Sequence, residues 1–459
     1  MLKRIKFFIC IMVFSVCMFV YNTGYADETI RVMVNNVYIN CPSPPVIIDG
    51  RTLVPLRALG EAMGCKVIWI PEGQYANIQN DAVLISVQVG NRFISKQKRV
   101  SSDTSSVVET DVPAQIINDS MYIPARAVAE AFDAIVGWDP NTNTVMIIYD
   151  TELKYAGNIN VSKWAGTGER QKHDSDSLYT MSFVSPESID VASDGSIYIA
   201  DSGKVRKISN GKSETIEFEP SYITANTIRC YGNDVYILTN EFQESDGTKY
   251  YGIVKLSGGY AEGVFVTEAL YSKITDFDFS LDGKMYVLQN NVGVGQNYVG
   301  QLDLSSGNIR TIATVDNGIT SMSIDKKGNI YLGNTTKGSI YHLNVSSGKV
   351  SLFAGADNKI KLVDGANPMF LEPRRLVYKD DALYVLDYNV LRKITINSAD
   401  MVVNCETLAG KISLESDPPT NDGKGSDVTF ASSYLMEFAV TNEGIVLTDP
   451  KKAVLRVIK

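Results

Sequence analysis

Hydrophobic and polar positions follow the same pattern twice in the first third of the chain. Residues 49–69 are DGRTLVPLRALGEAMGCKVIW, and residues 118–138 are NDSMYIPARAVAEAFDAIVGW. At a constant offset of 69 residues, the second copy repeats Pro55, Arg57, Glu61 and Trp69 as Pro124, Arg126, Glu130 and Trp138. An internal repeat of this kind indicates two copies of one supersecondary unit.

Each copy predicts a strand, a turn, a second strand, a helix and a third strand. In the first copy Asp49 and Gly50 form the turn, and Pro55 lies where the first turn of a helix accepts proline. The apolar helix positions are Leu56, Leu59 and Met63 in the first copy and Val128, Ala131 and Phe132 in the second. Because pairing two copies would bury both apolar faces, residues 27–150 are predicted to form one small, duplicated α+β domain.

The polar residues of the repeat predict no chemistry of their own. Arginine and glutamate lie four residues apart in each predicted helix, so we expect an exposed ion pair on each helix rather than a ligand-binding arginine. We expect Trp69 and Trp138 to lie in the core rather than to serve as platforms for sugar rings. Neither copy contains a nucleophile, a histidine or a pair of carboxylates suited to catalysis.

After residue 150 the helical periodicity disappears and short strands recur. Six units each contain an apolar strand, a turn rich in Asp, Asn or Gly, and a second strand that is usually aromatic. The second strands are marked by Tyr198, Tyr236, Tyr286, Tyr331, Tyr384 and Val446. Spacings of 38 to 62 residues between them suit four-stranded propeller blades with loops of variable length. The turns between paired strands are predicted to be hairpins rather than calcium sites.

The sixth unit has no fourth strand before Lys459. The segment VSKWAG at 161–166 matches the fourth strands SLFAG and ETLAG of other units, so it is predicted to complete the last blade. This closure removes the exposed edges of a partial propeller. The predicted fold class is therefore multi-domain: the small duplicated α+β domain, a linker at 151–160, and an all-β six-bladed β-propeller at 161–459.

The N-terminus predicts export. Lys3, Arg4 and Lys6 precede the apolar segment FFICIMVFSVCMFVY, and small residues lead to Ala26. Residues 1–26 are predicted to be a signal peptide cleaved after Ala26; a retained membrane anchor is the alternative, although the apolar run is only about 15 residues and a span needs roughly 20. Cleavage changes the formal charge from −9 to −12. This acidity argues against nucleic acid and anionic membranes as partners, and we expect no stable membrane insertion after cleavage.

Cysteines and histidines are few. The cysteines beyond the predicted signal peptide are Cys41, Cys65, Cys230 and Cys405. The first two could bridge within the small domain, whereas the other two are expected to be buried thiols. Because His173 and His342 are the only histidines, the chain cannot build a zinc site of several histidines, and no motif indicates a catalytic triad or a phosphate-binding loop. We therefore predict no catalytic residue, no metal and no cofactor.

Two family resemblances follow from these motifs. DGRTLVPLRALGEAMG and NDSMYIPARAVAEAF resemble the copper amine oxidase N-terminal-like domain, over about residues 30–150. That resemblance implies an accessory module of two related halves, common in exported proteins of Gram-positive bacteria and able to contact cell-wall polymers; it implies neither copper nor oxidase chemistry. The endings FAG and LAG and the segment DGANPMFLEPRRLV resemble the NHL-type propeller repeat, over about residues 155–459.

Six polar residues map near the start of the predicted innermost strands, at the mouth of the propeller tunnel. They are Glu187, Asn226, Asp276, Arg374, Arg375 and Glu437. The predicted function is that of a secreted or cell-wall-associated, non-enzymatic protein whose propeller binds a protein, a peptide or a cell-wall glycan.

Two alternatives remain open. One is a secreted metal-dependent hydrolase of the lactonase type, with carboxylates and amides of the tunnel mouth as metal ligands; the other is a rigid spacer within an envelope assembly. Clustering of Glu187, Asp276 and Glu437 within a few ångströms would favour the hydrolase, whereas basic neighbours would favour binding. Fold alone does not decide between them.

Overall fold

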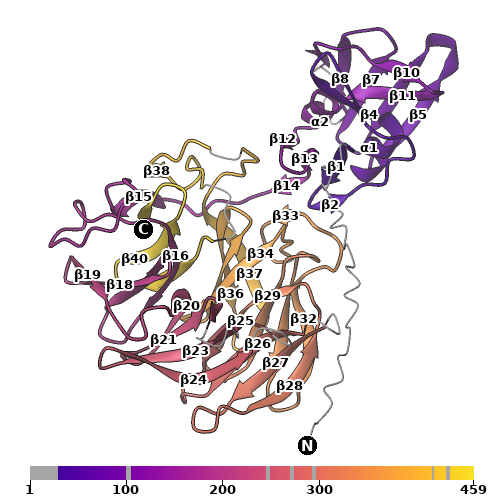
Figure 1. Ribbon diagram of the computed structural model, residues 1–459. Helices are drawn as coiled ribbons and strands as arrows, with labels where there is room; N and C mark the ends of the chain where they lie inside the picture. Colours follow the sequence, from indigo (N-terminus) through magenta and orange to yellow (C-terminus); the bar gives the residue numbers. More distant parts are fainter. Residues whose placement is uncertain are drawn as a thin grey trace, which may run out of the picture.

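The computed structural model contains a small region of mixed α and β structure and a larger ring of β-sheets (Figure 1). The described residues are 29–99, 105–243, 249–268, 273–291, 296–415, 418–430 and 435–459. The predicted signal peptide, including Ala26, lies outside them. No helix in this part of the chain has the length and hydrophobicity of a membrane span.

The small region comprises three sheets and two short α-helices within the described ranges. Its elements are β1 (Arg31–Val34), β2 (Val37–Tyr38), β3 (Val46–Ile48), β4 (Arg51–Pro55), α1 (Leu56–Ala62), β5 (Lys66–Ile70), the 3-10 helix η1 (Pro71–Gly73), β6 (Tyr75–Gln79), β7 (Val83–Gln88), β8 (Phe93–Lys98), β9 (Ser105–Glu109), β10 (Gln115–Ile117), β11 (Ser120–Pro124), α2 (Ala125–Ala131), β12 (Ile135–Asp139) and β13 (Thr144–Ile148). The sheet orders are β12-β13-β1-β2, β10-β11-β4-β3 and β5-β6-β7-β8-β9.

Five elements of the first half recur 69 residues later with the same lengths. Strands β3 and β4, helix α1 and strands β5 and β6 correspond to β10, β11, α2, β12 and β13. Each helix begins directly after the proline that ends the preceding strand, Pro55 or Pro124. Antiparallel pairing of β4 with β11 joins the two hairpins into one sheet. The predicted apolar helix positions are all buried, and side chains of both halves share one core.

The two halves differ in their tryptophans and helix ion pairs. Trp138 packs against the core, but Trp69 is 37% exposed, so the prediction of a core position was wrong for Trp69. Arg126 and Glu130 form the expected pair across one helical turn, at 3.8 Å. Arg57 and Glu61 form no ion pair with any residue of the described chain, because the Arg57 side chain extends from α1 toward the side of Trp69.

The larger region is built almost entirely of strands. They are β14 (Thr151–Glu152), β15 (Asn160–Ala165), β16 (Pro186–Val191), β17 (Ile197–Asp201), β18 (Lys204–Ser209), β19 (Lys212–Ile216), β20 (Ala225–Tyr231), β21 (Asp234–Thr239), β22 (Phe242–Gln243), β23 (Lys249–Ser257), β24 (Tyr260–Glu268), β25 (Lys273–Phe279), β26 (Met285–Asn291), β27 (Gln296–Leu302), β28 (Ile309–Val315), β29 (Ile319–Ile324), β30 (Ile330–Asn334), β31 (Ser339–Asn344), β32 (Lys349–Gly355), β33 (Leu362–Val363), β34 (Pro373–Lys379), β35 (Ala382–Asp387), β36 (Val390–Ile396), β37 (Val402–Ala409), β38 (Gly423–Lys424), β39 (Phe438–Thr441), β40 (Gly444–Asp449) and β41 (Val454–Ile458).

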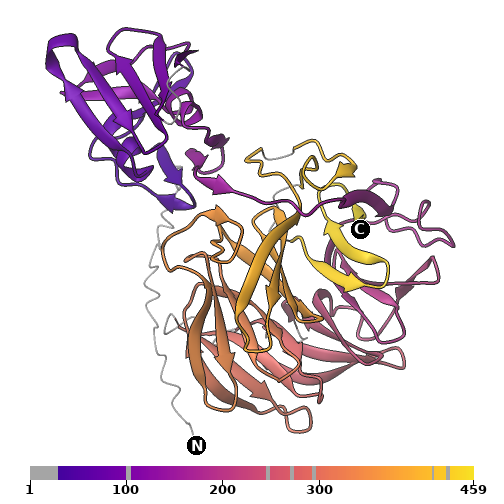
Figure 2. The ribbon, with the colours of Figure 1, turned by 180° about the vertical axis from the view of Figure 1, so that it is seen from behind.

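Consecutive sheets of this region are arranged around an axis, as Figure 2 shows from behind. Over the described residues the sheets begin with innermost strands β16, β20, β25, β29, β34 and β39. Each of these strands contacts the next, and β39 contacts β16, so they form a closed ring. Strand β15 pairs antiparallel with β41, which places the beginning and the end of this region in one sheet.

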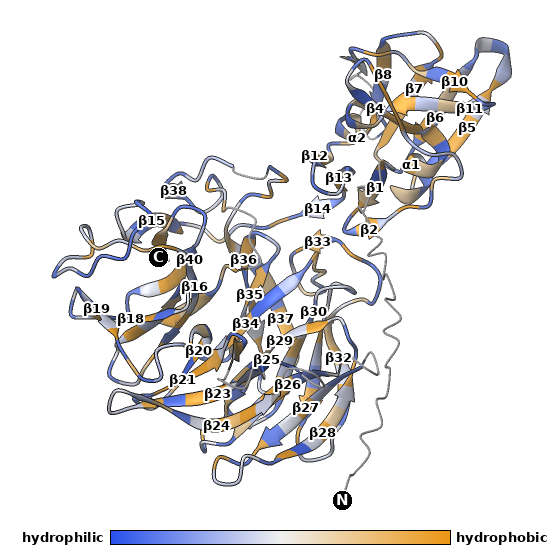
Figure 3. Ribbon diagram, viewed as in Figure 1, coloured by the Kyte–Doolittle hydropathy of each residue, from blue (hydrophilic) through white to orange (hydrophobic). Residues whose placement is uncertain are grey.

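Apolar side chains fill the spaces between neighbouring sheets. Figure 3 shows hydrophobic residues along the strands and polar residues in many of the connecting loops. One cluster, for example, packs Ile189 and Ile199 of the first sheet against Val446 and Leu455 of the last. These contacts have the sheet-on-sheet packing of a β-propeller, in which side chains from facing sheets form the core.

The small region is fixed to the ring by a shared core and by hydrogen bonds. An apolar cluster joins Ile135, Met146 and Ile148 to ring residues that include Leu371 and Leu414. Strand β14 pairs in parallel with β33, within the segment that the sequence predicts as a linker. The segment that connects the two regions therefore pairs with the ring through its backbone, and the regions themselves share apolar contacts.

All four cysteines of the described chain are free. Cys65 is buried in the core of the small region, and Cys41 lies at its edge, so the bridge that the sequence allowed between them is not formed. Cys405 is buried within the ring, as predicted.

Candidate binding site at the tunnel mouth

A β-bulge near the start of the innermost strands positions the candidate side chains. In five of the six strands the register with the second strand shifts at one residue: Glu187, Asn226, Thr275, Thr320 and Arg374. A bulge leaves its extra residue unpaired and redirects the side chain. Two successive residues of each strand therefore line the mouth, the bulged residue and the one after it.

All six candidate residues line one cavity of about 250 Å³ at this mouth. The structure thus brings together residues that are up to 250 positions apart in the chain. The other lining residues are mostly hydroxyl-bearing: Ser188, Thr227, Thr275, Thr320, Ser321 and Thr335, with Leu435 at the rim. The cavity is consequently polar, with acceptors and donors from every innermost strand.

Arg229 lies on the axis beneath the cavity and neutralises two of its three carboxylates. Its Nη2 donates to Asp276 at 2.7 Å and its Nη1 to Glu437 at 3.2 Å, although the two acids come from different sheets. Ser188 also donates to Glu437, at 2.7 Å. Both acids are therefore held by short, charge-assisted hydrogen bonds, which leaves neither as a free base.

Polar side chains of the innermost strands also join neighbouring sheets. In five places such a side chain accepts a hydrogen bond, of 2.6 to 3.2 Å, from a backbone N–H of the next innermost strand. The acceptors are Ser188 for Ile228, Asp190 for Cys230, Asp276 for Met322, Asp278 for Ile324 and Ser323 for Tyr378. Innermost strands of adjacent sheets do not pair through their backbones, so these contacts satisfy N–H groups that would otherwise be buried without a partner.

The axis acids have opposite pKa shifts. Burial raises the pKa of Glu437, but the charges of Arg229 and Arg375 outweigh burial, so this pKa lies below its ordinary value. Burial raises the pKa of Asp278 to about 6, since the charges of the same two arginines do not offset the effect of burial. At the mouth, burial also raises the pKa of Glu187.

Arg375 and Ser321 are buried at the cavity wall without hydrogen-bond partners. Arg375 is 7% exposed, and its Nε and Nη1 donate to no group of the described chain. The nearest carboxylate oxygens lie 3.6 Å away, on Asp276, and 3.9 Å away, on Glu437, beyond hydrogen-bond distance. The Ser321 hydroxyl likewise has no partner. These two groups can meet a ligand without breaking an existing hydrogen bond.

Arg374 and Asn226 already form hydrogen bonds within the chain, and the Asn226 Nδ2 donates to Asn240 at 3.1 Å. Arg374 donates to the buried Glu372 at 2.6 Å, and its guanidinium lies 4.7 Å from the ring centre of Tyr388. Glu372 in turn accepts a hydrogen bond of 2.6 Å from Asn36 of the small region. Arg374 therefore supports the contact between the two regions, while Arg375 faces the tunnel.

Histidines and metal ligands do not converge here. Within the described ranges, no group of three or more His, Cys, Asp and Glu side chains has an arrangement that could hold a metal ion. His173 is exposed in its loop, and His342 lies 3.8 Å from Asp325 in the fourth sheet.

The predicted set omits the residues that organise the axis, above all Arg229 and Ser188. A signal for them exists in the sequence: polar residues alternate with apolar ones in SIDV, TIRC, DFDF and SMSI, within strands that are otherwise apolar. Period-two alternation in an innermost strand places these side chains on the axis.

Comparisons with known proteins give one family-model match and several similar solved structures. Residues 33–147 match the family model of the copper amine oxidase N-terminal domain, which confirms that resemblance. A structural genomics protein of unknown function from Bacteroides thetaiotaomicron VPI-5482 is similar with a TM-score of 0.51 and 15% identity, over 85% of this chain and 100% of that chain. No curated protein matches the sequence.

Other similar structures carry different names. An auxiliary nutrient binding protein from the same Bacteroides strain has a TM-score of 0.48 and 14% identity, over 76% of this chain and 88% of that chain. Virginiamycin B lyase from Staphylococcus aureus has a TM-score of 0.36 and 11% identity, over 66% of this chain and 99% of that chain. At such identities the likeness concerns the fold, which is propeller-like in the larger region.

Proposed function

We propose that this chain is an exported, non-enzymatic binding protein of the cell surface, in which a six-bladed propeller of the NHL type binds its ligand at the tunnel mouth. The small region is the duplicated accessory module at about 27–150, and 161–459 form the propeller. The ligand is the end or side group of a peptide, protein or cell-wall glycan that presents an oxygen acceptor to the tunnel.

Arg375 and Ser321, whose buried donors have no hydrogen-bond acceptor in the described chain, carry this proposal. A buried donor without a partner costs free energy, about 1–3 kcal/mol and more for a charged group, and a ligand that supplies an acceptor recovers it. Both donors line the same cavity, beside the amide of Asn226 and the hydroxyls of the bulged threonines. This is the lining of a site for an uncharged or carboxylate-bearing polar group.

The neutralised carboxylates favour binding over hydrolysis. A lactonase-type centre needs carboxylates free to hold a metal, but Asp276 and Glu437 each accept hydrogen bonds from Arg229. Both also lie within 4 Å of Arg375. The acids therefore have the basic neighbours that argue for binding. Glu187, Asp276 and Glu437 do line one cavity, as the hydrolase alternative requires, but the arginine that holds two of them favours binding.

The test is co-sedimentation of the full chain with purified Gram-positive sacculi, at low and at physiological salt. We expect pelleting at both salts, and release by tri-alanine with a free carboxyl terminus but less by its C-terminal amide. Arg375→Met and Ser321→Ala should weaken pelleting roughly tenfold, because each removes a donor to the ligand.

Arg310→Met is the matched control, since Arg310 is exposed on strand β28 of the outer edge. Circular dichroism and thermal unfolding verify that each variant folds. Absence of pelleting at both salts would refute surface binding, and normal pelleting by folded Arg375 and Ser321 variants would refute the tunnel mouth as the site.

A further inference from the structure

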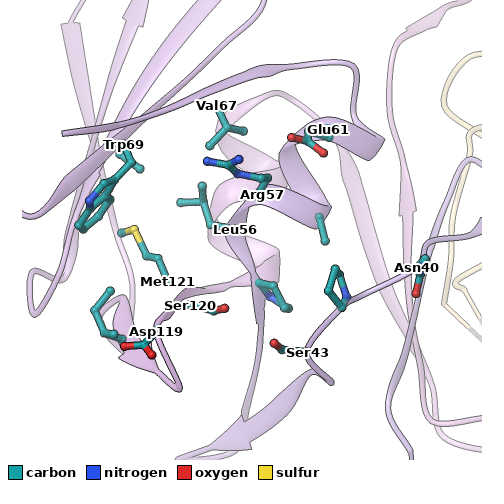
Figure 4. Close-up of a pocket in the computed structure, with 15 residues that line it drawn as sticks. Asn40, Ser43, Leu56, Arg57, Glu61, Val67, Trp69, Asp119, Ser120 and Met121 are labelled. Carbon is teal, nitrogen blue, oxygen red and sulfur yellow. The ribbon is translucent and has the colours of Figure 1, made fainter. Parts of the chain in front are cut away.

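A groove of the small region, lined mainly by residues of the repeat, contains Trp69. It has a volume of about 620 Å³ and is bordered by helix α1, strand β5, the β10–β11 hairpin and the segment around Pro42 (Figure 4). Its floor is apolar, formed by Leu56, Val67 and Met121, and Met121 points toward the Trp69 indole. Trp69 is thus the aromatic wall of an open groove.

The second half of the repeat has an ion pair at the position where the first half has its groove. At the offset of 69 residues, Ser120 corresponds to Arg51 and Pro42 corresponds to Asp111. Arg51 and Asp111 form an ion pair across that position, whereas serine and proline leave it open in the first half. The tryptophan of the second half packs against the core instead. The two copies of the pattern therefore differ at this position, so the repeat alone does not require the exposed indole.

The charged groups around the indole are also unengaged. Arg57, Glu61 and Asp119 all line the groove, and none forms an ion pair or a side-chain hydrogen bond with another residue of the described chain. In the second helix the corresponding arginine and glutamate are paired. The groove therefore presents one strong donor and two strong acceptors along its length, with Trp69 as one wall.

We propose that this groove binds a neutral oligosaccharide, with one sugar ring stacked on Trp69. Sugar hydroxyls both donate and accept, so successive rings of an oligosaccharide can meet Arg57 and the two carboxylates, while the C–H face of one ring packs on the indole. An anionic polymer would meet two carboxylates against one arginine, in a chain whose formal charge is −9. Strands β5 and β10, which border the groove, are edge strands of their sheets, so a peptide added as a strand is the competing occupant, and failure of every neutral tetrasaccharide to bind would favour it.

The site is separate from the tunnel mouth, and its test uses defined ligands rather than sacculi. Isothermal titration calorimetry of the full chain with cellotetraose, chitotetraose, maltotetraose and mannotetraose should show binding of at least one of them. Tetragalacturonate, an anionic tetrasaccharide, should not bind. Trp69→Ala and Arg57→Ala should each weaken binding roughly tenfold or more, and Trp69→Phe should keep part of it because an aromatic face remains.

Arg126→Ala is the matched control for Arg57→Ala, since it removes the corresponding arginine from the second half of the repeat. Arg375→Met tests independence, because it should leave tetrasaccharide binding unchanged even if it abolishes pelleting with sacculi. The proposal is wrong if no neutral tetrasaccharide binds at millimolar concentration, or if folded Trp69→Ala binds as tightly as the unmodified chain.

Discussion

At the scale of single residues, the axis of the ring shows how the same two arginines affect neighbouring acids differently. Glu437 receives direct hydrogen bonds from Arg229 and Ser188, so its charged form is favoured in spite of burial. Asp278 accepts only backbone N–H bonds, from Phe279 and Ile324, and burial raises its pKa to about 6. Direct hydrogen-bond partners, rather than position on the axis, decide whether the pKa of each acid is raised or lowered.

This difference predicts opposite stability changes in two conservative variants. The lowered pKa of Glu437 means that its contribution is present above the unfolded pKa, about 4.3, and is lost as the pH falls through the folded value. Glu437→Gln should therefore destabilise the fold at pH 7.5, by about 2–4 kcal/mol, because Arg229 loses a buried partner.

The raised pKa of Asp278 has the opposite effect on the stability of the fold. Between the unfolded pKa and about 6 the folded state binds more protons, so this group lowers the stability as the pH rises through that window. Asp278→Asn should raise the free energy of unfolding at pH 7.5 by about 1–2 kcal/mol and have little effect at pH 4. Urea unfolding at pH 4, 5.5 and 7.5 measures both variants; parallel pH profiles for the two would contradict the assignment.

At the scale of elements, the sheet that contains strands from both ends of the ring is the point where its closure can be tested. Val161 of β15 is 1% exposed and packs in the core beside Phe438 and Leu447, whereas its neighbour Ser162 faces solvent. Val161→Asp should cost roughly 3–5 kcal/mol, because it buries an unpaired charge. Ser162→Asp, on the same strand, should change the stability by about 0.5 kcal/mol or less.

Urea unfolding followed by tryptophan fluorescence and by circular dichroism distinguishes these variants. If β15 completes the ring, both signals should shift together in Val161→Asp. An unchanged midpoint in that variant would mean that the ring is stable without this strand.

The sequence predicted the strands and helices of this chain better than it predicted the residues of the tunnel. Every aligned second-strand residue, from Tyr198 to Val446, lies on a second strand of its sheet, since period-two alternation and hairpin turns are local signals.

The tunnel residues were predicted only in part. Glu187 and Asp276 follow from their places near strand starts, but the bulges and the link through Arg229 depend on which sheets meet at the axis. The same applies to Trp69, whose surroundings come from a hairpin about fifty residues further along the chain.

At the scale of the whole molecule, the apolar contact between the two regions uses a surface that only the second half of the repeat possesses. Gly137 of β12 lies against Leu414 of the ring, and a Cβ added at Gly137 would lie 2.5 Å from the Leu414 Cβ. The corresponding residue of the first half is Ile68, which is 36% exposed. Absence of a side chain at Gly137 therefore permits the contact that fixes the small region above the ring.

Restoring the residue of the first half should separate the two regions. Isoleucine suits a strand, so Gly137→Ile should leave β12 intact while its side chain displaces Leu414 and opens the apolar interface. Small-angle X-ray scattering should then show a larger radius of gyration, and trypsin should cleave faster at Lys154, whose backbone N–H donates to Asp364 in the joined state. Ile68→Gly, the reciprocal change on the exposed strand, should alter neither measurement. If Gly137→Ile scatters and resists trypsin as the unmodified chain does, the contact with Leu414 does not hold the regions together, and the backbone pairing of β14 with β33 must suffice.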